Sequence, residues 1–347
     1  MKEISMTESC FSYTGRIDFS DKSAPLFIWA GSFVKFSFVG TDITIDVNNY
    51  VLGNGVNLGY IVDGKQYKAD LIDGLQEIEI LKNAKNTRHE IIVFKRMESG
   101  HYFSINKVLL NDDAVLCEAE KKPEKRIEVY GDSVSAGEVC EAVENVGKVD
   151  PENNNGQWDN AWYSYPMIMS RQLPAEVYDT SQGGLALFDS TGYYEQPNTK
   201  GLEFTYNKLR YNPRYETSDW DFNRFVPHVI IIAIGQNDAF PNPDCLRDKE
   251  YYERWAGKYI EIVRDLHKKS PKATFVLTTT VLMHEKIWDD ILEDIKNRLK
   301  NELKVYHFMY LRNGAATPGH PRIPEQQEMA DELTEFLRRL PKSTWED

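Results

Sequence analysis

The hydrophobic pattern of this chain changes its period once, at a charged segment that contains a proline, residues 118–126. Before this segment, apolar and polar residues alternate over short runs, which is the pattern of strands with one buried face. After it, short apolar runs alternate with longer stretches whose apolar residues recur about every 3.6 residues, as in amphipathic helices. A length of 347 residues also favours two domains. We therefore predict a first domain over residues 1–122 and a second over residues 123–347.

The first region contains a series of strand-like runs with no convincing helix between them. One of these runs, residues 59–67, has the pattern of a hairpin with an Asp-Gly turn. Short strands at this spacing predict an all-β domain, a β-sandwich or jelly roll. Such a domain could bind glycans, or it could serve only as a rigid packing partner. The predicted strands are residues 32–39, 43–47, 59–67, 76–81, 89–96 and 103–110.

The second region predicts an α/β domain with three layers, a parallel sheet covered by helices on both faces. Right-handed crossovers would bring the carboxyl ends of the strands to one edge, where such folds keep their chemistry. Two polar loops, residues 146–160 and 192–219, leave this edge and could wall a site. The predicted strands are residues 127–130, 176–180, 228–234, 274–280 and 305–310, and the predicted helices are residues 163–173, 251–269, 287–299 and a last one from about Pro324.

Two short polar segments follow the first two of these strands. Gly131-Asp132-Ser133 follows the first, and Ser133 there can be a nucleophile if a base and oxyanion donors converge on it. Alone, the segment would be an ordinary turn in which Asp132 or Ser133 caps a helix. Gly183-Gly184 follows the second strand, where a glycine lets a backbone N–H approach a ligand closely. Paired glycines also make ordinary turns, so neither segment alone indicates a catalytic site.

Two further segments complete the set. Asn237-Asp238 follows the very apolar third strand, where the Asn237 amide could point at a developing oxyanion and Asp238 could fix the loop. Alone, these two residues would simply cap a turn. His320 lies in a loop between two prolines and is the candidate general base, with His284 as the runner-up. His228 begins its strand at the opposite edge of the sheet, so we discount it.

Taken together, Ser133, Gly184, Asn237 and His320 resemble the four blocks of the SGNH (GDSL-like) hydrolase superfamily. The resemblance implies a flavodoxin-like catalytic domain in which Ser133 is the nucleophile, Gly184 and Asn237 form the oxyanion hole, and His320 is the general base and acid. Because a β-domain precedes this domain, the chain is most similar to carbohydrate esterase family 2. That family implies a carboxylic ester hydrolase, a carbohydrate O-acetyl esterase of the acetylxylan or glucomannan type. Residues 160–165 and 220–227 also resemble this family.

One position departs from the superfamily pattern. The usual aspartate, three residues before the histidine, is replaced by Thr317. Two alternatives remain open: a main-chain carbonyl orients His320, which makes a Ser-His dyad, or a carboxylate from elsewhere, such as Glu325, substitutes. We prefer the dyad, because a neutral acceptor can also supply orientation and tautomer choice.

The substrate contacts are predicted from polar and aromatic residues near the expected cleft, namely Asp238, Trp158 and Phe240. A lipid or thioester hydrolase on the same scaffold is the alternative enzyme, and it would need an extended apolar channel. A non-catalytic glycan-binding protein is the alternative of another class. The presence of both Ser133 and His320 argues against it.

Composition excludes several kinds of partner. The chain has 41 Lys plus Arg and 54 Asp plus Glu, a net charge of −13 without a basic run, which makes nucleic acid and anionic membranes poor partners. The chain contains no run of ~18 apolar residues, the length that a membrane-spanning helix needs. The amino-terminal residues lack the apolar core of a signal peptide, which favours a cytoplasmic protein unless a leader has been removed. Four scattered cysteines and the histidine spacing predict no metal, cofactor or disulfide framework. We expect an acetylated oligosaccharide or polysaccharide as the partner, and the oligomeric state stays open.

Overall fold

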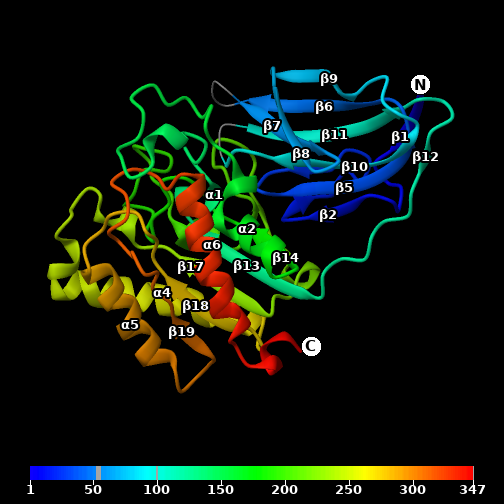
Figure 1. Ribbon diagram of the computed structural model, residues 1–347. Helices are drawn as coiled ribbons and strands as arrows, with labels where there is room; N and C mark the ends of the chain where they lie inside the picture. Colours follow the sequence, from blue (N-terminus) through cyan, green and yellow to red (C-terminus); the bar gives the residue numbers. More distant parts are fainter. Residues whose placement is uncertain (52–55, 99–100, 347) are drawn as a thin grey trace. The chain divides into compact units, whose positions relative to one another are not determined.

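The computed structural model describes residues 1–51, 56–98 and 101–346 (Figure 1). The chain forms two compact units. The first comprises Met1–Lys122 together with Asn155–Gln157, and the second comprises Pro123–Asn154 and Trp158–Asp347. No helix in the described ranges is long and apolar enough to cross a membrane.

The first unit is a sandwich of two antiparallel sheets, which confirms the predicted all-β fold. One sheet has the order β3-β4-β11-β6-β9 with β1 beside β11, and the other has the order β12-β5-β10-β7-β8 with β2 beside β5. Their buried apolar side chains form one core. The strands are β1 (Lys2–Ser5), β2 (Ser12–Thr14), β3 (Ile17–Asp18), β4 (Leu26–Phe27), β5 (Phe33–Gly40), β6 (Ile43–Val51), β7 (Asn57–Val62), β8 (Lys65–Asp70), β9 (Gly74–Leu81), β10 (Thr87–Lys95), β11 (His101–Leu110) and β12 (Val115–Leu116).

The predicted hairpin is β7 and β8, which pair from Val62 with Lys65 outward. The strands that the sequence did not predict, β1 to β4 and β12, are two to four residues long. Alternation is recognised over about 4–8 residues, so β2, β3, β4 and β12 are too short for it and β1 has only the minimum length.

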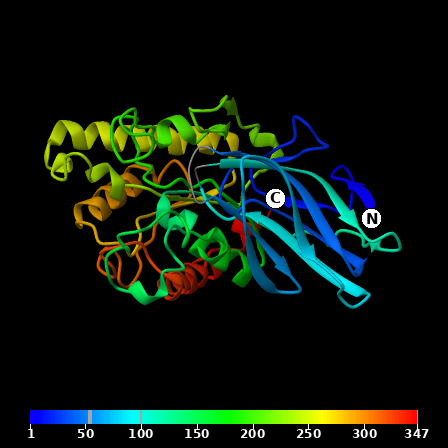
Figure 2. The same cartoon turned by 90° about the horizontal axis from the view of Figure 1, so that it is seen from above.

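The second unit contains a parallel sheet in the order β14-β13-β17-β18-β19, which confirms the predicted three-layer α/β fold. Figure 2 shows this sheet between α4 on one side and α6 on the other. The order is that of flavodoxin-like folds, in which ligands bind at the carboxyl ends of the strands. The strands are β13 (Lys125–Gly131), β14 (Ala175–Asp179), β17 (Val229–Ala233), β18 (Thr274–Thr278) and β19 (Val305–His307), and the helices are α1 (Ser133–Ala136), α2 (Tyr165–Gln172), α3 (Leu202–Thr205), α4 (Lys249–Lys269), α5 (Ile287–Leu299) and α6 (Ile323–Arg338).

The apolar stripes of the helices explain the layers. Side chains of α2 and α6 join those of the sheet in one core, in which Tyr165 and Met329 are fully buried. On the other face, Trp255 of α4 meets Trp288 of α5 with 5.6 Å between ring centroids. The predicted loop over residues 192–219 also contains α3 and a small hairpin of β15 (Lys208–Arg210) and β16 (Ser218–Asp219).

The register of the sheet brings the polar segments together. Gly131 at the end of β13 pairs with Ala233 of β17, and Val129 pairs with Asp179 at the end of β14. The segments that begin at Asp132, Thr180 and Ile234 therefore leave neighbouring strands at the same edge.

Candidate active site

The nucleophile candidate lies on the first turn after β13. Asp132 is the N-cap of α1, and its Oδ1 accepts a hydrogen bond from the Val134 N–H at 3.0 Å. Ser133 is the first residue of this short helix, and it is 4% exposed. Within the described residues its Oγ makes no hydrogen bond. The strand-to-helix turn thus holds the Ser133 backbone in place and leaves its hydroxyl available to a partner.

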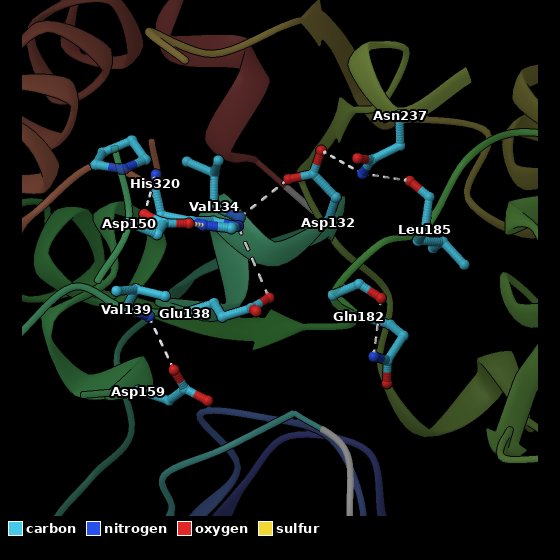
Figure 3. Close-up of polar contacts among 12 residues, drawn as sticks. Asp132, Val134, Glu138, Val139, Asp150, Asp159, Gln182, Leu185, Asn237 and His320 are labelled. Atoms are coloured by element: carbon cyan, nitrogen blue, oxygen red, sulfur yellow. Dashed lines mark hydrogen bonds and ion pairs between the residues drawn. The ribbon is translucent and has the colours of Figure 1, made fainter. Parts of the chain in front are cut away.

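The Asp132 side chain connects the first segment to the third (Figure 3). Its Oδ2 accepts a hydrogen bond from Asn237 Nδ2 at 3.3 Å. The same oxygen accepts a second hydrogen bond from Gln236 Nε2 at 2.8 Å. Burial raises the pKa of Asp132 to about 6, against the stabilising effect of the hydrogen bonds from Val134 and Gln236. Asp132 therefore ties the turn after β13 to the turn after β17.

Gly184 and Asn237 lie on adjacent loops. Gly184 has a φ of +72°, and a Cβ there would come within 2.8 Å of Tyr193 Cβ, so only glycine fits. Asn237 Nδ2 donates to the carbonyl of Leu185 at 3.0 Å, in addition to Asp132 (Figure 3). Both hydrogens of this amide thus have protein acceptors. In the described part of the chain, neither the Ser133 N–H nor the Gly184 N–H has an acceptor.

His320 is held by a carboxylate that was not predicted from the sequence, that of Asp150. Its Nδ1 lies 2.6 Å from Asp150 Oδ2, and its backbone N–H donates to Asp150 Oδ1 at 2.9 Å (Figure 3). The preferred dyad, with a main-chain carbonyl on the ring, is therefore corrected: the orienting group is Asp150. Glu325 does not substitute either, because its carboxylate accepts from the backbone N–H of Arg322 at the start of α6 and from the backbone N–H of Gly147 in the polar loop.

Arg322 fixes this acid in turn. Its guanidinium is fully buried and donates to Asp150 Oδ1 at 2.8 Å and to the carbonyl of His320. Glycine at position 319 leaves room for this carboxylate, because a Cβ there would lie 2.6 Å from Asp150 Oδ1. Burial acts against the charge on Asp150, but the hydrogen bonds from His320 and Arg322 outweigh it and hold the pKa of Asp150 well below its usual range. An ionised carboxylate can only accept, so Nδ1 of His320 carries a proton.

The loop of His320 is attached to the helix of the nucleophile. Gln326 Nε2 donates to the carbonyl of Val134 at 2.9 Å, and the Ile323 N–H donates to the carbonyl of Cys140 at 2.8 Å. Glu138, which follows the same helix, places Oε2 3.8 Å from Nε2 of His320. The fourth segment thus lies beside the first, as the resemblance implies.

The other predicted residues differ in their surroundings. Asp238 is 1% exposed and accepts from the Leu187 N–H at 3.0 Å and from Thr191 Oγ1 at 3.2 Å. Burial raises its pKa to about 7. Its carboxylate fixes the loop after β14 and is not presented to a substrate, which corrects its assignment as a substrate contact. Phe240 is 38% exposed, and Trp158 is half-buried.

His284, the runner-up base, is occupied elsewhere. Its Nδ1 lies 2.7 Å from the carbonyl of Leu282, and its Nε2 lies 3.3 Å from Asp289 Oδ1. Its side chain is almost fully buried, so it holds the loop after β18. Across the described ranges, no group of three or more His, Cys, Asp or Glu residues is arranged to hold a metal ion.

Comparison with known proteins shows similarity to carbohydrate esterases of family 2 in both sequence and fold. Residues 13–119 match the model of the carbohydrate esterase 2 N-terminal domain. The chain is 26% identical to the acetylxylan esterase / glucomannan deacetylase of Cellvibrio japonicus (strain Ueda107), over 94% of this chain and 87% of that protein. A solved family two carbohydrate esterase from Cellvibrio japonicus superposes with a TM-score of 0.81 at 24% identity, covering 100% of this chain and 99% of the other. A family two carbohydrate esterase from Clostridium thermocellum, solved with cellohexaose, gives 0.79 at 23% identity, covering 96% and 99%.

Proposed function

Because the chain is related to carbohydrate esterase family 2 and has the SGNH hydrolase fold, we propose that it is a carbohydrate O-acetyl esterase that uses Ser133 as its nucleophile. The observation that carries the proposal is the placement of His320, held by Asp150 and attached to the helix of Ser133. We further propose acetylated plant polysaccharides or their oligosaccharides as substrates, since the relative from Cellvibrio japonicus is an acetylxylan esterase / glucomannan deacetylase.

The reaction proceeds in two acyl-transfer steps. Nε2 of His320 takes the proton of the Ser133 hydroxyl as Oγ attacks the ester carbonyl, and the resulting imidazolium is stabilised by Asp150. The imidazolium then protonates the leaving sugar alcohol, and acetyl-Ser133 remains. Water, activated by the same histidine, releases acetate and restores Ser133.

The oxyanion is held by the N–H groups of Ser133 and Gly184 and by the amide of Asn237. The two N–H groups are available because they have no acceptor among the described residues. Asn237 is bound to Leu185 and, by a longer contact of 3.3 Å, to Asp132. The N–H that donates to Leu185 keeps the amide in position. The other N–H exchanges its hydrogen bond to Asp132 for one to the oxyanion. Each such donor contributes a factor of about 10²–10³ to kcat.

An exposed aromatic pair supports a sugar substrate. The rings of Tyr193 and Phe240 stack with centroids 4.6 Å apart, and the two residues are 52% and 38% exposed. The pair stands next to the oxyanion loop, because the Tyr193 N–H donates to the carbonyl of Gly184 at 2.8 Å. Aromatic faces beside a few polar groups are typical of sites for small organic ligands. We assign the sugar contact to Phe240 with Tyr193, and Trp158 remains a proposed contact on the polar loop.

The test is release of acetate from acetylated xylan and acetylated glucomannan, compared with hydrolysis of para-nitrophenyl acetate and butyrate. Wild type, Ser133→Ala and the exposed control Ser343→Ala are assayed side by side, with a thermal melt to show that each is folded. We expect the acetyl substrates to be cleaved much faster than butyrate, and activity to be lost only in Ser133→Ala. Faster cleavage of longer acyl chains would favour a lipid or thioester hydrolase, and activity retained in Ser133→Ala would reject the assigned nucleophile.

A further inference from the structure

His320 lies between two carboxylates, one at each ring nitrogen (Figure 3). Asp150 Oδ2 is 2.6 Å from Nδ1, at hydrogen-bond distance. Glu138 Oε2 is 3.8 Å from Nε2, which is the distance of an ion pair. Nε2 is the atom that exchanges a proton with Ser133 in the proposed reaction. A second carboxylate at this nitrogen is not needed to orient the ring, because Asp150 already does so.

The backbone on both sides of Glu138 is fixed by the helix of the nucleophile and by the loop that follows. The helix ends at Gly137, whose φ is +76°, and the Glu138 N–H donates to the carbonyl of Ser133 at 3.0 Å. The next N–H, of Val139, donates to Asp159 Oδ1 at 2.8 Å (Figure 3). The Glu138 side chain is 24% exposed, so water screens its charge only in part. Its position relative to Ser133 is therefore set by local structure.

The remaining charges around the ring are few. Asp132, fully buried at the N-cap of the same helix, acts on the ring only through its charge. Asp150 faces it from the polar loop, with its charge partly compensated by Arg322. Arg322 itself donates to the carbonyl of His320, and not to Glu138. In the described part of the chain, His320 is the ion-pair partner of Glu138.

We propose that Glu138 is a positioning residue that controls the protonation of His320 at Nε2, and thereby the pH range in which Ser133 can be activated. The catalytic part of this inference depends on the proposed function. Burial disfavours a charged ring, but the carboxylates of Glu138 and Asp150 outweigh burial and raise the pKa of His320 to about 9. At neutral pH Nε2 is then mostly protonated and cannot accept the Ser133 proton. The same negative charge stabilises the imidazolium once His320 has taken the proton of Ser133. Glu138 therefore has two opposite effects: it lowers the fraction of His320 that is neutral, and it makes the neutral imidazole a stronger base.

The test is Glu138→Gln, which keeps the shape of the side chain and removes its charge. The protonation of His320 is followed by NMR titration of its imidazole signal, assigned by comparison with His320→Gln among the seven histidines. In parallel, kcat/KM for para-nitrophenyl acetate is measured as a function of pH. We expect the titration midpoint and the acid limb of the rate profile to move together to lower pH by about 1–3 units. The control is Glu144→Gln, an exposed glutamate on the following loop, which should leave both unchanged.

The two readouts separate this inference from the proposed function. A midpoint that falls in Glu138→Gln supports control by Glu138 even if no ester is cleaved, because the titration requires no substrate. A midpoint that stays at its wild-type value overturns the inference, whatever the esterase activity. A rate profile that moves without the midpoint also overturns it, because the effect would then not be on His320.

Discussion

The contact between Asp150 and His320 can be tested by replacing a single atom. Asp150→Asn keeps the shape of the side chain and replaces one carboxylate oxygen by an amide NH₂. The carboxylate accepts from three donors: His320 Nδ1 at 2.6 Å, the His320 N–H at 2.9 Å and Arg322 Nη2 at 2.8 Å. The His320 N–H and Arg322 Nη2 both donate to Oδ1, whereas among the described residues Oδ2 accepts only from the His320 ring. The asparagine oxygen is therefore expected to face Arg322 and the backbone, and its NH₂ to face the ring.

This orientation determines the expected loss of activity. An NH₂ group facing Nδ1 requires that nitrogen to be the acceptor, which moves the proton of a neutral imidazole to Nε2. Nε2 is then unable to accept the proton of Ser133. In serine hydrolases with a histidine-bound aspartate, the same substitution lowers kcat by about 10⁴ through the wrong tautomer. We expect a loss of that order here. Because Arg322 keeps an acceptor, the loss of stability should stay below the ~3–5 kcal/mol that breaking a buried ion pair costs.

The assay is kcat and KM for para-nitrophenyl acetate, together with the free energy of unfolding from urea denaturation. Asp331→Asn, an exposed aspartate on α6, is the matched control and should behave as wild type. A folded Asp150→Asn enzyme with near-normal kcat would refute the reasoning, since a main-chain carbonyl or another neutral acceptor would then suffice.

Two further predictions concern the proposed oxyanion hole and a buried acid at the end of β14. Asn237→Ala should lower kcat by about 10²–10³ with little change in KM, and an unchanged kcat would reject its role as a donor. Asp179 is buried at the end of β14, and burial raises its pKa to about 8. The native state keeps this proton at pH values at which the unfolded chain has lost it. The free energy of unfolding should therefore fall as the pH rises from about 4 to about 8, by up to ~1.4 kcal/mol per pH unit. Asp179→Asn should remove the contribution of this group, so that the slope measured by urea denaturation at several pH values becomes shallower; equal slopes in both proteins would contradict the prediction.

The sequence was sufficient to predict both folds and the edge of the sheet at which the four segments gather. The first three segments directly follow apolar runs, and parallel pairing brings them together, as the pairs of β13 with β14 and β17 show. The fourth segment, with His320, lies in the last loop before α6 and is attached to the first by Gln326 and Ile323. Their catalytic roles stay predictions. The short strands β1, β2 and β4 were not predicted, because they form by pairing with longer strands further along the chain, β11 or β5. β3 was not predicted either, and it pairs with β4 over two residues.

Asp150 could not be found in this way, for a physical reason. It lies in a polar loop without periodicity, and its position depends on contacts with residues far away in the chain. One signal was available: Thr317 occupies the usual place of the acid, so a carboxylate had to come from another segment if it came at all. The requirement for glycine at position 319 and the role of Arg322 become visible only once the distance of each to Asp150 is known.

Moving the acid to another loop changes what the orientation of His320 depends on. When the acid and the histidine are three residues apart, local backbone geometry sets their distance. Here the distance depends on how the loop that carries Asp150 is held against the start of α6. Two charged residues after His320 hold it: Arg322 binds Asp150 itself, and Glu325 accepts from the Gly147 N–H of the same loop at 3.2 Å. The segment of the polar loop around Asp150 is therefore part of the support of His320, the proposed general base, and changes in this segment should affect catalysis without altering Ser133.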